Sequence, residues 1–299
     1  MAIGCLEPRW KTLYANRLEV SFTDADIYAI DILSRNATNL TSHQGKALNT
    51  ASSISPDGKT RLITSDAKSG YQNVALLDIA SRKVPWVTDT KWEASAWDFS
   101  PDGKQFTYAI NADGGSDVYL GDTATPKSDK IPIGSGAIGF AAYPSSFSGG
   151  RLLLSHESSV EPADFWVYDL ASRKPRQLTY SVIASLNSAP RPPSQLVSYK
   201  SLDGKTISEL LWVPFSLKRD GSSPALLLPH GGPTGQSQDY WSPRIAQPRL
   251  PRIHLHCSQR ARLDRVWHRV SKGQLPGPGR RRSAGTRYTR PNFSKQPVT

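Results

Sequence analysis

The chain has 299 residues, of which 37% are hydrophobic, and its 37 Lys and Arg outnumber its 25 Asp and Glu to give a formal net charge of +12. This hydrophobic share is compatible with a folded core. The sequence contains no run of about 18 apolar residues, so we expect no transmembrane helix. The opening MAIGCLEPRWKT lacks a basic stretch followed by an apolar one, so it does not read as a signal peptide. We expect a cytoplasmic location by default, or a periplasmic one if the amino terminus is incomplete. Two cysteines, Cys5 and Cys257, exclude a disulfide framework.

The positive charge is concentrated at the carboxyl end. Residues 244–299 hold 14 of the 37 Lys and Arg and a single acidic residue, Asp264, which leaves 23 basic and 24 acidic residues in 1–243. The larger part of the chain is therefore close to neutral. A basic tail of this kind is typical of a solvated arm or of a non-specific nucleic-acid contact, and it predicts no specific nucleic-acid partner.

Two interleaved signatures repeat along the first 180 residues. SPDGK at 55–59 recurs 45 residues on at 100–104, with a weaker copy, FSGGR, at 147–151. Pro, Asp and Gly in this order predict a tight hairpin turn. The second signature is D-x-x-S-R, which occurs at 31–35, 78–82 and 169–173 with DTAT at 122–125 in the gap.

Apolar runs of strand length surround these turns. They precede the second signature at 27–30, 74–77, 118–120 and 165–168, and they follow SPDGK at 60–64 and 105–109, with a further short strand at 176–179. A period of about 45 residues with four short strands is typical of a propeller blade. We therefore predict a mainly β fold with about four blades in residues 21–185, while 1–20 match no blade. An ordinary antiparallel sandwich is the alternative.

A different pattern begins after a linker at 190–193. Residues 195–200 and 207–214 predict antiparallel strands, and the apolar run PALLLP at 224–229 suits a strand buried on both faces of an α/β sheet. The run ends abruptly in HGGPTG. We predict that 195–243 form the amino-terminal part of an α/β-hydrolase domain.

From about Leu196 to Pro243 the sequence resembles the start of the catalytic domain of the prolyl oligopeptidase family, through SLDGK, LLWVP, LLLPHGGP and DYWSPR. The resemblance is to the acylaminoacyl- and dipeptidyl-peptidase branches of the family, and the repeats resemble the TolB- and WD40-like blades of such proteins. The resemblance implies a serine peptidase that cleaves short peptides without a cofactor. The loop His230-Gly231-Gly232-Pro233 then lies beside the oxyanion hole, where its glycines let the backbone approach the substrate. His230 shapes this loop and is not the catalytic base.

The catalytic triad of that family is absent from the sequence. No G-x-S-x-G occurs in the 299 residues, so no serine sits on a nucleophile elbow. Ser116 reads as a hairpin serine, and His43 and His156 fall inside the repeats. The tail contains His254, His256 and His268, but no acidic or cysteine cluster accompanies them, so we predict no metal site.

We expect the basic tail, 244–299, to be low-order, out-of-frame sequence. Codons consistent with the residues shown, read one base later, turn 247–250 into SRGF and 258–267 into ANVRGSTGYG, strings similar to the family's continuation after HGGP. We therefore expect a truncated copy with a frameshift near residue 245.

The leading prediction is an inactive fragment of a serine peptidase. The alternative is a TolB-like propeller that binds a protein or peptide and needs no triad. The sequence predicts no oligomeric state.

Overall fold

The computed structural model describes residues 2–6, 11–20, 23–125, 127–140, 146–181, 192–200, 204, 206–215, 217, 218, 220, 222, 224–228, 230, 236–242 and 254–258. The chain divides into two compact units. Unit 1 comprises Met1–Ile183 and Gln238–Trp241, and unit 2 comprises Ala184–Ser237 and Ser242–Thr299. Every regular element in the described residues is a β-strand.

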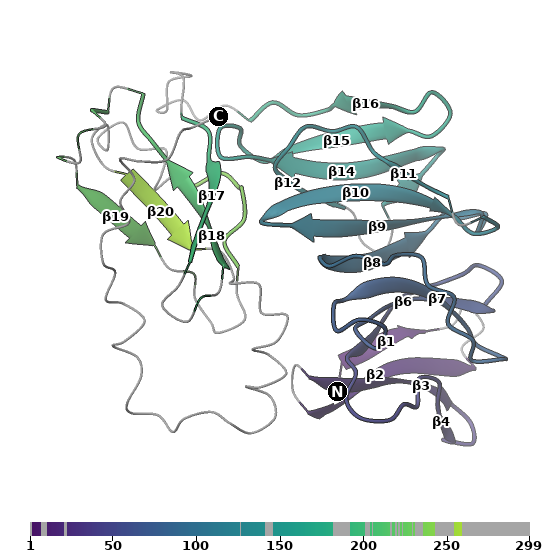
Figure 1. Cartoon of the computed structure of the whole chain (residues 1–299). Helices are drawn as coiled ribbons and strands as arrows, with labels where there is room; N and C mark the ends of the chain where they lie inside the picture. Colours follow the sequence, from purple (N-terminus) through teal and green to yellow (C-terminus); the bar gives the residue numbers. More distant parts are fainter. Residues whose placement is uncertain are drawn as a thin grey trace. The chain divides into compact units, whose positions relative to one another are not determined.

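Unit 1 consists of four antiparallel sheets that follow one another in chain order (Figure 1). Sheet 1 has the order β1-β2-β3-β4, with β1 (Ala2–Leu6), β2 (Thr12–Val20), β3 (Asp24–Asp31) and β4 (Ala37–Asn39). Sheet 2 comprises β5 (Asn49–Ile54), β6 (Thr60–Ser65) and β7 (Asn73–Asp78), and a bridge from Ala75 to Trp86 extends it. The segment 2–20, which the repeat pattern left unassigned, thus supplies two strands of sheet 1.

The next two sheets repeat this plan. Sheet 3 contains β8 (Glu93–Phe99), β9 (Gln105–Ala112), β10 (Gly115–Asp122) and β11 (Ser128–Lys130). Sheet 4 contains β12 (Ala137–Phe140), β14 (Arg151–Glu157), β15 (Asp164–Asp169) and β16 (Lys174–Gln177), with β13 (Phe147–Ser148) paired to β14. The strands predicted before each D-x-x-S-R lie in β3, β7, β10 and β15, and those predicted after SPDGK lie in β6 and β9.

The repeated signatures form the turns that the sequence predicts. In the first SPDGK, the Ser55 hydroxyl donates to Asp57 Oδ1 at 2.6 Å and the Lys59 N–H donates to the same oxygen at 3.1 Å. Gly58 takes a φ of 73°, which a residue with a Cβ rarely adopts. The second copy repeats these contacts from Ser100 to Asp102 at 2.7 Å.

Each D-x-x-S-R closes the turn after the third strand of its sheet. Asp78 Oδ1 accepts hydrogen bonds from the Ser81 hydroxyl at 2.6 Å and the Ser81 N–H at 2.7 Å, which hold the pKa of the Asp78 carboxyl below its ordinary value. Arg82 then adopts a φ of 56°. The same left-handed conformation recurs at Arg35 and Arg173, so the arginine marks the turn geometry of each repeat.

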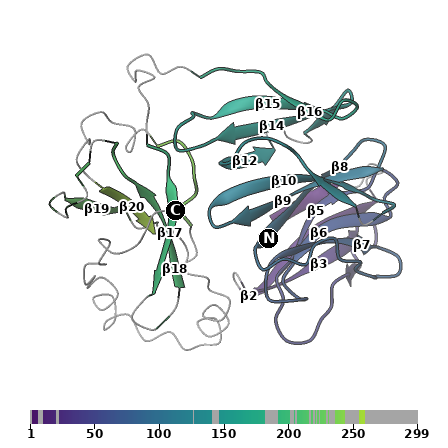
Figure 2. The ribbon, with the colours of Figure 1, turned by 45° about the horizontal axis from the view of Figure 1, so that its top comes forward.

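Successive sheets of unit 1 lie face to face (Figure 2), and buried apolar side chains pack between them. Ile27 of sheet 1 packs in one cluster with Ile63 and Leu77 of sheet 2. Other residues of sheet 2, such as Leu62, cluster with Phe106 of sheet 3. A third cluster joins sheets 3 and 4 through side chains that include Val118, Leu120, Leu152 and Leu154. Each sheet therefore buries its apolar faces against its neighbours along the chain.

A polar bracket, not anticipated from the sequence, ties the third strand to the segment after it in three sheets. A Thr hydroxyl donates to an Asp or Asn 15 residues earlier and accepts the N–H of the residue after that Asp or Asn. The pairs are Asp26 with Thr41, Asn73 with Thr88 and Asp164 with Thr179. In sheet 3 the corresponding positions are Asp117 and Pro132, and Pro132 has no hydroxyl.

Unit 2 contains one four-stranded sheet, sheet 5, in the order β17-β18-β20-β19. β17 (Gln195–Lys200), β18 (Thr206–Trp212) and β20 (His254–Ser258) pair antiparallel in turn, whereas β19 (Ala225–Leu228) pairs parallel to β20. The antiparallel pair predicted at 195–214 is confirmed.

Two expectations about unit 2 need correction. The run at 224–229 was expected to be buried on both faces, but β19 is an edge strand and Leu226 is 41% exposed, because β20 alone pairs with it in the described sheet. Residues 254–258, placed in a low-order tail, form β20 instead. Its position between β18 and β19 gives the backbone groups of both neighbours a pairing partner, a demand that local sequence does not reveal.

The close packing of β9 on β10 can be tested at Gly121. Gly121 lies opposite Phe106 in the register, and a Cβ added there would overlap the buried Phe106 ring. Gly121→Ala should therefore destabilise the protein by about 1–3 kcal/mol in urea denaturation followed by Trp fluorescence. Gly115→Ala in the same strand meets only ordinary van der Waals contacts and is the matched control. Equal stability of the two variants would contradict the packing.

Candidate functional site

The loop singled out by the sequence follows the carboxyl end of β19. His230 is half-buried at its start. Gly231, Gly232 and Pro233, the other predicted loop residues, lie outside the described residues. HGGP follows β19 in the sequence, and the ligand-binding loops of α/β sheets likewise follow strands of the sheet.

β18 forms the buried centre of sheet 5. Leu210, Leu211 and Trp212 are buried, as is the carboxylate-bearing Glu209 at 2% exposure. The Tyr199 hydroxyl of β17 donates to Glu209 Oε1 at 3.0 Å. No sequence pattern singles out Glu209, because an acidic residue within a strand normally faces solvent.

The segment after the loop returns to unit 1. The Asp239 N–H donates to the Gly114 carbonyl at 2.9 Å, and Asp239 Oδ1 accepts the Ser159 N–H at 3.1 Å. The Trp241 N–H donates to Glu157 Oε2 at 3.1 Å. DYWSPR was predicted as part of the hydrolase domain, yet its first three residues belong to unit 1, where they contact the backbone of Gly114 and Ser159 and the Glu157 carboxylate.

The serine and one of the histidines noted within the repeats have structural surroundings. Ser116 lies in β10 and its N–H donates to the Gly136 carbonyl at 2.9 Å, in keeping with a hairpin serine. The His156 ring is buried, and its Nε2 lies 3.0 Å from the Ser135 carbonyl oxygen. Its centroid lies 6.0 Å from the centroid of the Trp166 ring, in a T-shaped arrangement. These contacts fix the orientation of the His156 ring, and neither of them involves a nucleophilic side chain.

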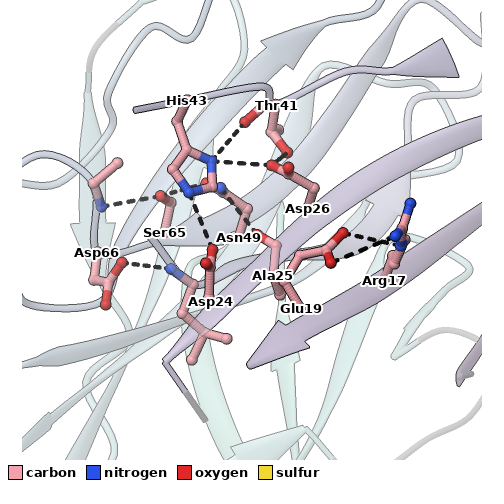
Figure 3. Close-up of polar contacts among 12 residues, drawn as sticks. Arg17, Glu19, Asp24, Ala25, Asp26, Thr41, His43, Asn49, Ser65 and Asp66 are labelled. Carbon is pink, nitrogen blue, oxygen red and sulfur yellow. Dashed lines mark hydrogen bonds and ion pairs between the residues drawn. The ribbon is translucent and has the colours of Figure 1, made fainter. Parts of the chain in front are cut away.

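The second histidine, His43, lies between two carboxylates (Figure 3). Its Nδ1 is 3.1 Å from Asp26 Oδ1 and 3.0 Å from the Thr41 carbonyl, and its Nε2 is 3.2 Å from Asp24 Oδ1. Partial burial acts to lower the pKa of His43. The hydrogen bond to Thr41 and the charges and hydrogen bonds of the two aspartates outweigh that effect, so the pKa is raised above its ordinary 6.5.

A pocket of about 230 Å³ opens beside β15 and β16. Its lining includes His156, Glu161, Asp164, Trp166 and Tyr180. The Asp164 carboxylate already accepts hydrogen bonds from Thr179 and from Gln177, at 2.7 and 3.1 Å. The Asp164 carboxylate of this pocket is thus committed to the bracket of sheet 4.

Two further features are absent from the part of the chain that the structure describes. No group of three or more His, Cys, Asp or Glu side chains there could hold a metal ion. This part of the chain contains no helix, and therefore none that is long and apolar enough to cross a membrane.

Comparison with solved structures gives matches along most of the chain. A prolyl endopeptidase, one of two studied for the role of inter-domain dynamics in catalysis and specificity, matches with a TM-score of 0.71 at 17% identity, over 85% of this chain and 37% of its own. A Mycobacterium tuberculosis puromycin-hydrolysing peptidase matches with a TM-score of 0.71 at 12% identity, over 86% and 41%. Prolyl oligopeptidase B from Galerina marginata matches with a TM-score of 0.73 at 15% identity, over 88% and 38%.

The chain thus has the fold of part of the prolyl oligopeptidases and spans about two fifths of the length of these structures. At the level of fold, the resemblance inferred from the sequence is confirmed. No established family profile matches the chain. No curated protein matches it in sequence.

The Asp239 anchor can be tested by mutation. Asp239→Ala removes the acceptor of the buried Ser159 N–H, which should destabilise unit 1 by about 1–3 kcal/mol and increase amide exchange at 157–160. Asp239→Asn keeps an acceptor oxygen and should retain most of the protection.

Asp220→Ala is the control for the loss of an aspartate, because the Asp220 carboxylate is exposed and accepts hydrogen bonds from Ser222, two residues away. Hydrogen–deuterium exchange with mass spectrometry gives the readout. Unchanged exchange at 157–160 in Asp239→Ala would show that the anchor does not hold this loop.

Proposed function

We propose that the chain is a portion of a serine peptidase of the prolyl oligopeptidase family: four blades of a β-propeller followed by the opening strands of an α/β-hydrolase domain. The order of elements carries the proposal. Four repeated antiparallel sheets come first, then the antiparallel pair β17–β18, then the short apolar strand β19, which HGGP follows in the sequence.

The chemistry of the intact protein would be acyl transfer from a peptide to a serine, followed by hydrolysis. The backbone N–H groups of the loop at Gly231 and Gly232 would face the oxyanion that develops on the peptide carbonyl. A propeller at the entrance would restrict substrates to short peptides. In this chain the oxyanion donors have no nucleophile to act with, because the 299 residues contain no G-x-S-x-G.

A second candidate is a binding module formed by unit 1. Its support is that three apolar clusters join sheets 1 to 4 without contributions from sheet 5. Limited proteolysis separates the two candidates. A resistant core ending near residue 180 favours a module, whereas degradation throughout favours a defective portion of a peptidase.

The absence of catalysis can be measured directly. With oxyanion donors but no serine nucleophile, the purified chain should give no turnover of chromogenic peptide substrates above that of a heat-denatured sample. A known prolyl oligopeptidase assayed in parallel is the positive control. Turnover that a serine-directed covalent inhibitor abolishes would overturn the proposal.

The origin of the basic tail is part of the same proposal. We attribute residues from about 247 onward to the hydrolase gene read out of frame, since GC-rich codons read out of frame yield Arg, Pro and Gly. Sequencing the locus should reveal an insertion or deletion near codon 245 and a G-x-S-x-G encoded downstream in another frame. DNA that encodes no such segment in any frame would refute the frameshift.

A further inference from the structure

In three sheets the Asp or Asn of the bracket has a further contact with the residue two positions after the bracket Thr. In sheet 1 this contact is made by a side chain, whereas in sheets 2 and 4 it is made by a backbone N–H. In sheet 2 the Thr90 N–H donates to Asn73 Oδ1 at 2.9 Å, and in sheet 4 the Ser181 N–H donates to Asp164 Oδ1 at 2.9 Å. Both donors lie two residues after the bracket Thr. The equivalent residue in sheet 1 is His43, and there the imidazole ring contacts Asp26 Oδ1.

The surroundings of the ring require a proton on each nitrogen. Nδ1 faces the Asp26 carboxylate and the Thr41 carbonyl, and both can only accept. Nε2 faces the Asp24 carboxylate, which in its ionised form also only accepts. Neutral imidazole carries one N–H, so only the imidazolium satisfies both sides of the ring. The side chains are 17%, 11% and 16% exposed for His43, Asp26 and Asp24, which limits screening by solvent.

We propose that Asp24, Asp26 and His43 form a proton-operated clasp that ties the segment after β4 to the start of β3. With the ring protonated, His43 bridges both carboxylates. When Nε2 loses its proton to water, its lone pair faces the Asp24 carboxylate and this arm of the clasp opens. Asp26 stays in place because Thr41 and Asn39 donate to it at 2.8 and 2.7 Å.

The arrangement is a clasp rather than a metal site. The two aspartates lie at different nitrogens of one ring, so their oxygens do not converge on a common point with it (Figure 3). Among the contacts of the described residues, the Asp24 carboxylate has the His43 ring as its one side-chain partner. Asp24 is therefore the arm whose attachment depends on the proton.

Other charged groups near the clasp have their own contacts. On β2, Arg17 pairs with Glu19 at 2.9 Å. Asp66, which follows β6, accepts the backbone N–H of Leu48 at 2.7 Å. Lys46 lies exposed on the segment that leads into β5. The charge that faces the ring is thus that of the two aspartates on β3.

The direction of the pH dependence follows from the raised pKa of His43. The folded-state pKa lies above the ordinary 6.5 of an unfolded chain, so the clasp contributes its full stability below 6.5 and loses it as the pH rises through the folded pKa. Each unit by which the pKa is raised corresponds to about a tenfold change in the unfolding equilibrium constant.

The test is an NMR titration of the full chain labelled with ¹³C at histidine Cε1, between about pH 5 and 9. His43→Gln identifies the His43 signal by its disappearance. The wild-type signal should titrate with a midpoint above 6.5, and Asp24→Asn should lower that midpoint. In parallel, the denaturant midpoint of wild type should exceed that of His43→Gln at acidic pH and converge with it at alkaline pH.

The chain offers a matched control in sheet 2, where Asn73 already fills the position of Asp26. Asn73→Asp adds a carboxylate to a bracket that has no ring and should leave the His43 titration unchanged. Asp24→Asn leaves the Asp26–Thr41 bracket intact and so keeps the test informative if His43→Gln does not fold. A His43 midpoint at or below 6.5, or a midpoint that Asp24→Asn does not move, would overturn the clasp.

Discussion

The structure of unit 1 depends on the burial of apolar side chains between successive sheets. No single sheet of three to five short strands can bury both of its faces alone, so each is stabilised by the sheets that neighbour it along the chain. Leu62 and Ile63 illustrate this, because adjacent residues of β6 point into different clusters, one with sheet 3 and one with sheet 1. Sheets 1 and 4 carry exposed apolar side chains, including Val20 and Phe165.

Polar contacts fix the geometry that this packing requires. In the turns at SPDGK and D-x-x-S-R, side chains form hydrogen bonds with nearby backbone groups. The Asp/Asn–Thr brackets join the start of the third strand to the segment after it in three of the four sheets. The bracket buries hydroxyl and carboxylate or amide groups in satisfied pairs, which avoids the penalty of unpaired polar groups. In sheet 1 the His43 ring takes the place of the backbone donor, so the stability of this bracket depends on the protonation of the ring.

The chemistry proposed for the intact protein resides in unit 2, and the two histidines of unit 1 serve structure. His156 is held by a carbonyl and an aromatic edge, and His43 by two carboxylates. The return of Asp239 to unit 1 means that the segment bearing the glycine loop begins and ends on unit 1. The structure matches cover 85% and 88% of the chain, which is more than the repeats alone.

The turns, most of the strands and the short apolar strand before HGGP could be predicted from the sequence alone. These features are local, because Pro, Gly and Asp act on their own backbone and alternation of polarity acts within a few residues. The Asp/Asn–Thr spacing of 15 was present in the sequence too, and alignment of the repeats would have revealed it. The place of β20, the edge position of β19, the anchor at Asp239 and the two carboxylates at His43 are visible only in the folded chain. Each joins residues distant along the chain, and their contacts depend on how the strands pair and pack.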